Sequence, residues 1–255
     1  MSEHDDHKQA EFKTALLMAA GMGTRIRPLS EKIPKPLISV RGVPMIETNI
    51  QAMRQAGVER IYITVGYKKD KYDYLKRKYD NLIFIENTEY KTKNTISSFY
   101  AAMEYLQGNH CIISEGDLYL ADPSIIKGQA DRSRYLLRYT APQDCEWGFE
   151  MEGTRITKIV RPRPGVFLNH HMYGVAYWLK EDLDLLIESV GALYQQKGHE
   201  TLAYDEAANT ILDQINMGVI ALDEGHLYEI DCLEDLARVD ASYGAYLEKQ
   251  GVKKV

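Results

Sequence analysis

Residues 17–37 read LMAAGMGTRIRPLSEKIPKPL, and this stretch decides the fold. The short, mostly apolar run Lys13–Met18 predicts a β-strand, and the small residues of AAGMGTR predict the loop that follows it. Gly21 and Gly23 allow the backbone to approach a ligand closely and to point several N–H groups at an anion. Arg25 and Lys35 add two cations that suit triphosphate oxygens and a negatively charged leaving group.

Helices and strands alternate through the first half of the chain. We expect helices at Pro44–Ala56, Lys68–Lys78 and Thr95–Leu106, and strands at Arg60–Val65, Leu82–Glu86 and His110–Ser114. This alternation predicts a parallel, doubly wound sheet that binds its ligands above the carboxyl ends of the strands.

Strands follow one another with little helix between them after residue 120. We expect them at Arg134–Tyr139, Trp147–Glu152, Arg155–Val160, His171–Trp178 and Val219–Leu222, with helices at Glu181–Gln195, Asp205–Asp213 and Leu233–Leu247 and a turn or loop at Arg161–Gly165. The prediction is an α/β fold with a mostly parallel central sheet and a smaller antiparallel, substrate-side part. We expect residues 1–12 to be a disordered leader and residues 13–255 to form a single domain.

Composition narrows the class of protein. The chain has 255 residues, of which 45% are hydrophobic and 27% are charged, and its net charge is −6. An acidic chain argues against a general nucleic-acid binder. No apolar run approaches the roughly 18 residues of a membrane span, and the polar N-terminus is no signal peptide. Three widely spaced cysteines suggest neither disulfides nor a zinc site, so we expect a cytoplasmic protein. No protein partner is predicted.

Acidic residues supply a candidate metal site. Glu115, Gly116 and Asp117 follow a predicted strand, and Asp231 follows a short strand in LYEIDCLEDL. Carboxylates at strand ends are hard oxygen ligands, which suit Mg²⁺ bound together with phosphate oxygens.

The loop motif resembles the sugar-nucleotide pyrophosphorylase superfamily, whose signature is close to GxGTRxxPxTxxxPKP. Only Ser30 departs from it, where the signature has threonine. The resemblance implies a Rossmann-like nucleotide-diphospho-sugar transferase fold, with Arg25 and Lys35 on the triphosphate. It also implies that Asp117 and Asp231 hold the catalytic Mg²⁺, with Glu115 as a helper.

Further segments resemble bacterial CTP:phosphocholine cytidylyltransferases over most of residues 13–240. They are VGYKKDKYDYLKRKY, NTISSFYAAMEYL, Glu146-Trp147 and YEIDCLEDL. The resemblance implies that CTP lies over the loop formed by Ala20, Gly21, Gly23 and Thr24. Asn94 and Ser97–Ser98 stand at the start of a predicted helix, where amide, hydroxyl and helix N-terminal N–H groups suit a base or ribose. An acceptor oxygen would then attack the α-phosphorus in line, with no nucleophilic side chain required.

The acceptor is expected to be a small phosphorylated or phosphonate amine. A quaternary ammonium prefers aromatic faces and carboxylates, and the candidates are Trp147, Tyr173, Tyr204, Asp205 and Glu206. The Glu-Gly-Asp strand end and the run LAYDEAA depart from the phosphocholine enzymes and resemble cytidylyltransferases that activate 2-aminoethylphosphonate. Phosphocholine is placed narrowly ahead of 2-aminoethylphosphonate. His170 and His171 are candidates for a phosphonate contact, although ordinary strand or loop roles suit them better.

Two other functions remain open. A hexose-1-phosphate nucleotidyltransferase of the same fold is disfavoured by Glu146-Trp147 and by the short chain. A non-catalytic nucleotide sensor is disfavoured because Lys35, Asp117 and Asp231 are all present. An oxidoreductase of the dinucleotide-binding type does not fit, because Pro28 interrupts the helix that must follow its loop.

Overall fold

Strand β2 (Thr14–Ala19) is buried along its whole length. In this computed structural model, which describes residues 9–141, 145–161, 163–164 and 168–249, the side chains of β2 alternate between two hydrophobic cores. Leu16 and Met18 pack into one core, and Leu17 packs into the other. Successive residues of a strand point to opposite faces of a sheet. The apolar run before the glycine loop is therefore a central strand that is covered on both sides.

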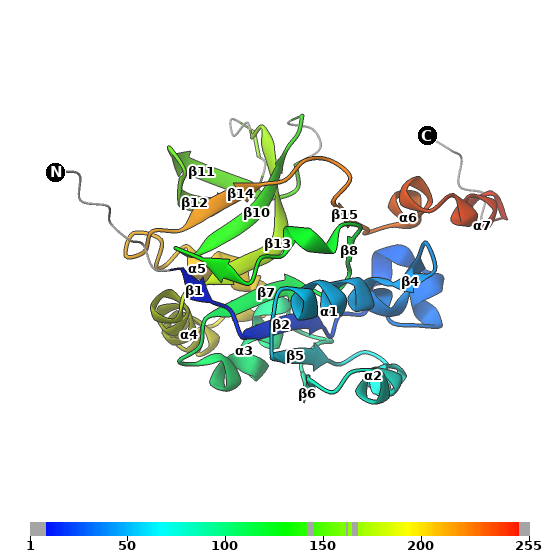
Figure 1. Cartoon of the computed structure of the whole chain (residues 1–255), viewed down its shortest axis with the longest axis horizontal. Coiled ribbons are helices and arrows are strands. Elements are labelled where there is room, and N and C mark those ends of the chain that lie inside the picture. Colours follow the sequence, from blue (N-terminus) through cyan, green and yellow to red (C-terminus); the bar gives the residue numbers. More distant parts are fainter. Residues whose placement is uncertain (1–8, 142–144, 162, 165–167, 250–255) are drawn as a thin grey trace.

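The central sheet has seven strands in the order β14-β10-β13-β7-β2-β5-β6 (Figure 1). The strands are β5 (Arg60–Val65), β6 (Leu82–Glu86), β7 (Cys111–Glu115), β10 (Arg134–Tyr139), β13 (His170–Trp178) and β14 (Gly218–Ala221), together with β2. Neighbouring strands run parallel except where β13 pairs with β7 and β10. The expected mostly parallel sheet is confirmed.

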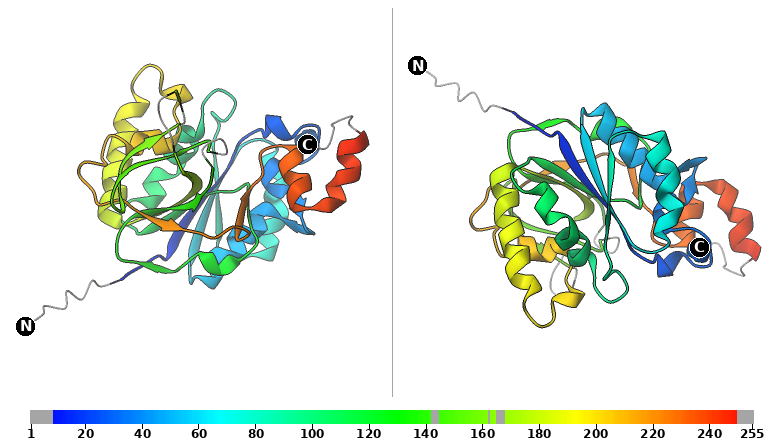
Figure 2. Two further views of the ribbon diagram at one scale, coloured as in Figure 1. Left: turned by 90° about the horizontal axis from the view of Figure 1, so that it is seen from above. Right: turned by 90° about the horizontal axis from the view of Figure 1, so that it is seen from below.

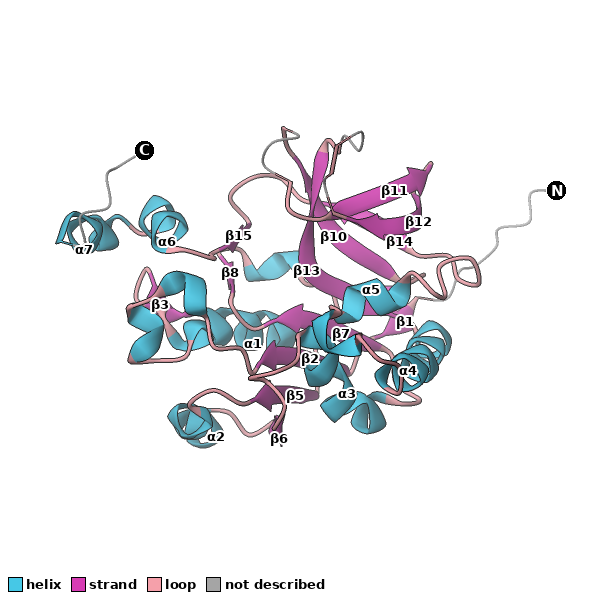
Figure 3. Ribbon diagram, turned by 180° about the vertical axis from the view of Figure 1, so that it is seen from behind, coloured by secondary structure: helices cyan, strands magenta, loops and turns pink. Residues whose placement is uncertain are grey.

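Helices cover both faces of this sheet (Figure 3). Helices α3 (Thr95–Leu106), α4 (Lys180–Tyr194) and α5 (Tyr204–Ala208) contribute to one core. Helices α1 (Met45–Gln55) and α2 (Asp73–Lys78) contribute to the other. This layering leaves the carboxyl ends of the parallel strands free for ligands.

Short antiparallel pairs accompany the central sheet. Strands β11 (Gly148–Glu152) and β12 (Arg155–Val160) form a hairpin, and β8 (Leu118–Leu120) pairs with β15 (Leu227–Glu229). Two small pairs lie elsewhere, β3 (Ser39–Val40) with β4 (Val43–Pro44), and β1 (Ala10–Glu11) with β9 (Gln129–Ala130). The expected antiparallel part is confirmed.

The C-terminal segment lies beside the segment that follows the glycine loop (Figure 2). Helix α6 (Leu233–Val239) packs in one core with Ile26 and Ile38. The prediction of one helix over 233–247 was wrong, because α6 ends before Asp240 and α7 (Gly244–Lys249) begins afterwards. The Asp240 carboxylate accepts hydrogen bonds from the backbone N–H of Arg41, at 2.6 Å, and of Ser242.

Two other predicted boundaries need correction. The helix expected at 205–213 ends at Ala208, where the Asn209 side chain bonds the N–H and the carbonyl of Ile159 on β12. The last residues of the expected leader are ordered, because Ala10–Glu11 form β1 and Phe12 is fully buried, whereas residues 1–8 lie outside the described part. No helix of the described residues is both long and apolar enough to cross a membrane.

Candidate active site

Lys35 joins the two predicted metal-binding aspartates. Its Nζ lies 2.8 Å from Asp117 Oδ2 and 2.6 Å from Asp231 Oδ1, although 196 residues separate Lys35 from Asp231. The Lys35 side chain is only 8% exposed. Burial alone would lower the Lys35 pKa, but the two carboxylates outweigh it and hold the pKa above its ordinary value. Lys35 is therefore a permanent cation at the centre of this site.

The pairing of β8 with β15 explains why the aspartates meet. Glu229 pairs with Leu118, and Leu227 pairs with Leu120, in antiparallel register. Continuing this register by two residues places Asp231 next to the β7–β8 turn that contains Asp117. A short ladder thus brings together carboxylates from the middle and the late part of the chain.

Arg25 completes the charged centre. Its guanidinium lies 2.9 Å from Asp231 and 3.8 Å from Glu146, and the Arg25 side chain is 63% exposed. The guanidinium is therefore open to an incoming phosphate. The structure brings Arg25, Lys35, Asp117 and Asp231 together, as the sequence predicts.

Gly23 makes room for Lys35. Its φ of 59° lies in the left-handed region, and a Cβ there would stand 2.8 Å from the Cβ of Lys35. Gly23 thus acts through the packing of Lys35, and a direct contact with a nucleotide is not needed to explain it.

A cleft of about 420 Å³ opens beside this charged centre. It is lined by the glycine loop, the start of α3, the end of β7, and segments of β13 and α5. The lining residues include Ala20, Gly21, Arg25, Asn94, Thr95, Ser98, Glu115, Asp117, Glu146, Trp147, Arg161, Asp205, Glu229 and Asp231.

Some of the residues expected to bind the nucleotide line the cleft, and others do not. Ala20, Gly21 and Asn94 line the cleft, and Asn94 caps α3 by accepting a hydrogen bond from the Thr95 N–H. Ser97 does not line it, because its buried hydroxyl accepts from Asn87 Nδ2 at 2.9 Å and donates to the Asn94 carbonyl. Its neighbour Ser98, the other serine candidate, does line the cleft. Gly23 and Thr24 also lie outside the lining, in the loop that leads to Arg25.

Three carboxylates gather at the far side of the cleft. Glu115 is the last residue of β7, Asp205 is the second residue of α5, and Glu229 is the last residue of β15. Burial, together with the charges of Asp117, Glu229 and Asp205, raises the pKa of Glu115. Burial raises the pKa of Asp205 to about 6. Within the described residues, none of the three carboxylates forms an ion pair with a lysine or an arginine, so this side of the cleft favours a cationic ligand.

Gly174 allows Glu115 to enter this group. A Cβ at Gly174 on β13 would stand 2.8 Å from the carboxyl carbon of Glu115. Asp205 accepts a hydrogen bond from the Tyr135 hydroxyl at 2.8 Å. Both carboxylates are thus fixed by strands of the central sheet.

His171 fixes the third carboxylate. Its Nδ1 accepts a hydrogen bond from the Glu146 N–H at 3.3 Å, so Nε2 carries the hydrogen and donates to Glu229 at 2.6 Å. His170 instead accepts from the Phe149 N–H at 3.0 Å and joins β13 to β11. Neither histidine lines the cleft.

Trp147 lines the cleft with one face covered. The Arg161 guanidinium carbon lies 4.1 Å from the centre of the Trp147 ring, and the same guanidinium lies 3.5 Å from Glu206. Glu206 also accepts a hydrogen bond from the Ala203 N–H at 2.9 Å and so caps α5. Glu206 therefore contacts Arg161 and its own helix. It was expected to contact the acceptor, but it does not line the cleft.

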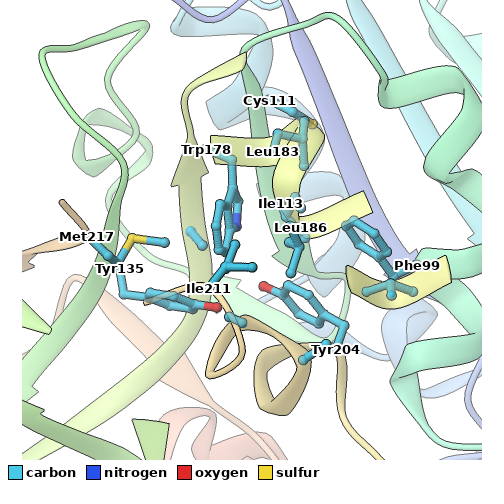
Figure 4. Close-up of a cluster of buried hydrophobic side chains, with 14 of the residues drawn as sticks. Phe99, Cys111, Ile113, Tyr135, Trp178, Leu183, Leu186, Tyr204, Ile211 and Met217 are labelled. Atoms are coloured by element: carbon cyan, nitrogen blue, oxygen red, sulfur yellow. The ribbon is translucent and has the colours of Figure 1, made fainter. Parts of the chain in front are cut away.

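The two candidate tyrosines do not reach the cleft. Tyr204 is fully buried and stacks on Phe99 with ring centres 5.6 Å apart, inside the core that contains Trp178 (Figure 4). Residues 204 and 205 of a helix point about 100° apart, so Asp205 faces the cleft while Tyr204 faces the core. Tyr173 is 3% exposed, and its hydroxyl donates to the Leu227 carbonyl at 3.2 Å. Tyr173 nevertheless lines a neighbouring hollow of about 680 Å³, which shares Glu146, Glu229 and Asp231 with the cleft. The expected acceptor contact therefore does not fit the buried position of Tyr204, whereas for Tyr173 it stays a prediction.

The aspartate pair fits a magnesium ion that arrives with phosphates. Asp117 and Asp231 already converge on one cationic atom, Lys35 Nζ. Mg²⁺ in nucleotide enzymes commonly takes one or two carboxylates and completes its shell with phosphate oxygens and water. Among the described residues there is no group of three or more histidine, cysteine, aspartate or glutamate side chains that could hold a metal by itself.

Sequence reasoning missed Glu229 and Arg161 as cleft residues. Glu229 stands two positions before Asp231, and residues two apart in an extended chain share a face, so this spacing was a usable signal. Arg161 gave no such signal, because its place depends on the β11–β12 hairpin.

Comparisons with known proteins agree with this geometry. Residues 15–145 match the model of the MobA-like NTP transferase domain. The chain is 38% identical to a 2-aminoethylphosphonate cytidylyltransferase of Lancefieldella rimae, over 92% of this chain and 94% of the relative. It is 30% identical to a choline-phosphate cytidylyltransferase of Streptococcus pneumoniae, over 89% and 96%. The solved CTP:phosphocholine cytidylyltransferase of Streptococcus pneumoniae has a TM-score of 0.82 at 27% identity, covering 91% of this chain and 99% of that one.

Proposed function

This chain belongs to the MobA-like NTP transferase family and is a nucleotidyltransferase similar to cytidylyltransferases, and from this premise we propose that it transfers CMP from CTP to 2-aminoethylphosphonate. A phosphonate oxygen attacks the α-phosphorus of CTP. The bond between the α-phosphorus and its bridging oxygen to the β-phosphorus breaks, and pyrophosphate leaves with that electron pair. The product is CMP joined to the aminophosphonate.

The choice of acceptor rests on the cluster of three carboxylates formed by Glu115, Asp205 and Glu229. A primary ammonium has three N–H donors and binds best to several acceptor oxygens, whereas a quaternary ammonium has none. Burial raises the pKa of both Glu115 and Asp205, and repulsion from neighbouring carboxylates adds to the rise at Glu115, so a bound ammonium would favour their charged forms. The 38% identical relative is named for 2-aminoethylphosphonate, which supports the same choice.

Residues of the charged centre supply the remaining chemistry. Arg25 and Lys35 would hold the triphosphate and stabilise charge on the departing pyrophosphate. Asp117 and Asp231 would hold Mg²⁺, which when bound supplies charge neutralisation to the phosphate oxygens. The cluster of three carboxylates would orient the acceptor so that the phosphonate of the acceptor faces the α-phosphorus. The protein contributes alignment and charge, and it needs no covalent intermediate.

Phosphocholine is the second candidate acceptor. Trp147 is an aromatic residue of the cleft, of the kind that attracts a quaternary ammonium, and two of the similar proteins are named for choline phosphate. We rank it second because Tyr204, the other aromatic residue of the expected acceptor pocket, lies in the core.

A pyrophosphate-release assay tests the proposal. The purified protein with Mg²⁺ is offered CTP, UTP, ATP or dTTP against 2-aminoethylphosphonate, phosphocholine, phosphoethanolamine or glucose 1-phosphate. We expect CTP with 2-aminoethylphosphonate to give the highest kcat/KM, with phosphoethanolamine, which shares the primary amine, above phosphocholine. A higher kcat/KM for phosphocholine would refute the proposed acceptor, and activity with dTTP and glucose 1-phosphate would refute the proposed reaction.

A further inference from the structure

A cation of the protein itself covers one face of Trp147, an aromatic residue that lines the cleft. The Arg161 guanidinium lies 4.1 Å from the centre of the Trp147 ring, within the range of a cation–π contact. Both residues line the cleft. A quaternary ammonium would seek this same face, because Tyr204 is not available to it.

The β11–β12 hairpin builds this contact into the fold. Gly148 pairs with Val160, so Trp147 and Arg161 stand opposite each other one residue beyond the ladder. The backbone carbonyl of Trp147 accepts a hydrogen bond from the Met172 N–H at 2.8 Å, which fixes the tryptophan against β13. The aromatic ring and the cation therefore come from neighbouring, tied segments of chain.

Glu206 also contacts Arg161. Its carboxylate lies 3.5 Å from the guanidinium and accepts a hydrogen bond from the Ala203 N–H at the start of α5. Arg161 thus contacts both Trp147 and Glu206. The Arg161 guanidinium therefore has a carboxylate partner in the absence of any ligand.

We propose that Arg161 is a specificity-determining residue that excludes quaternary ammonium acceptors from the Trp147 face. A trimethylammonium group can bind there only by displacing the guanidinium or by standing next to a like charge. A primary ammonium does not meet this obstacle, because it binds the carboxylates Glu115, Asp205 and Glu229. Specificity of this kind comes from an element that repels the wrong substrate as well as from contacts to the right one.

The inference rests on the proposed function and concerns the ratio of two kcat/KM values, for 2-aminoethylphosphonate and for phosphocholine, each measured with saturating CTP. Arg161→Ala frees the indole face. We expect the ratio to fall by about three- to thirtyfold, which is the range of a cation–π contact, mainly because kcat/KM for phosphocholine rises. Arg161→Lys, which keeps the charge but stacks less well, should give a smaller fall, and the KM for CTP should stay unchanged in both variants.

Two further variants separate specificity from general damage. Glu206→Gln keeps an acceptor for the Ala203 N–H but releases the guanidinium, so it should shift the ratio in the same direction by a smaller factor. Arg54→Ala is the matched control, since Arg54 also stacks on an aromatic ring (Tyr79, 5.7 Å) and pairs with an aspartate (Asp80, 2.8 Å), but away from the cleft. Arg54→Ala should leave the ratio unchanged.

The outcomes are distinguishable. An unchanged ratio in Arg161→Ala would overturn the inference. So would an equal loss for both acceptors, since it would mean that Arg161 binds the phosphate or phosphonate group that they share. A preference of the wild-type protein for phosphocholine would instead refute the proposed acceptor, while the effect of Arg161 would still be read from the change in ratio.

Discussion

Replacing Gly23 by alanine should disable turnover and destabilise the protein, because two separate costs arise at one position. The backbone of Gly23 has a φ of 59°, a left-handed conformation that residues with a Cβ adopt at a cost. A new Cβ would also stand 2.8 Å from the Cβ of Lys35, closer than two such carbons can approach. Lys35 is buried and held by Asp117 and Asp231, so it cannot move aside without disturbing both ion pairs.

The size of the effect follows from these two costs. The left-handed conformation costs about 1–2 kcal/mol for a residue with a Cβ. Relieving the clash in a packed region costs about 1–3 kcal/mol more. Together they amount to about 2–5 kcal/mol, which predicts a fall in Tm of about 4–20 °C for a chain of this size. A shift of Lys35 by about 1 Å should lower kcat by roughly 10²-fold.

The measurement needs a control that carries only the first cost. Gly57 has a φ of 85°, and a Cβ there would meet nothing within 4 Å. Gly57→Ala should therefore lose about 1–2 kcal/mol of stability and keep full turnover. Both variants are compared with the wild type by urea unfolding and by pyrophosphate release at saturating CTP and acceptor.

The difference between the two variants decides the matter. If Gly23→Ala loses no more stability than Gly57→Ala and turns over at the wild-type rate, then the close packing of Gly23 on Lys35 does not matter. If Gly23→Ala is destabilised further but retains full kcat, then the position of Lys35 is not critical for the reaction.

Three other perturbations test separate parts of the site. Asp117→Asn keeps the shape of the side chain but removes its charge, so kcat should fall about 10²- to 10³-fold in the pyrophosphate assay, and full turnover would remove Asp117 from the mechanism. Burial raises the pKa of Asp205 to about 6 from 3.8, so the native protein binds its proton more tightly than the unfolded chain; the resulting stability is complete below about pH 4 and is lost as the pH rises through 6. This loss amounts to about 3 kcal/mol. In Asp205→Asn the free energy of unfolding, measured with urea between pH 4 and 7, should lack this pH-dependent loss. If the wild type and the variant give parallel pH profiles, the raised pKa of Asp205 is contradicted. Glu229→Gln should raise the KM for 2-aminoethylphosphonate about 10- to 100-fold, while Tyr204→Phe should leave it within about twofold, and the reverse order in acceptor titrations would restore Tyr204 to the acceptor pocket.

Local sequence patterns were sufficient for the sheet and for the order of the site elements. The alternation of strands and helices, the glycine loop and the basic loop each depend on neighbouring residues, and the structure reproduces them with small shifts in boundaries. Helix ends were less predictable, because long-range contacts set them. Asn209 ends α5 by bonding β12, and Asp240 interrupts the C-terminal helix by bonding Arg41.

The directions of the side chains determine which residues of α5 line the cleft. These directions could not be predicted from the sequence. Tyr204 and Asp205 are adjacent in LAYDEAA, yet one lies in the core and the other lines the cleft, because successive helical residues point about 100° apart. The rotation of α5 about its axis depends on its packing against Phe99 and Tyr135. Composition and spacing cannot fix that rotation.

The sequence by itself determined which groups are present: a glycine-lined loop, two cations and separated carboxylates of the kind that bind a triphosphate. Only the tertiary structure decided that Lys35 lies between Asp117 and Asp231, and that Arg161 covers Trp147. The reason is that strand register sets both arrangements, through β8 with β15 and β11 with β12. Register follows from how a whole face is buried, and a stretch of sequence taken alone does not reveal it.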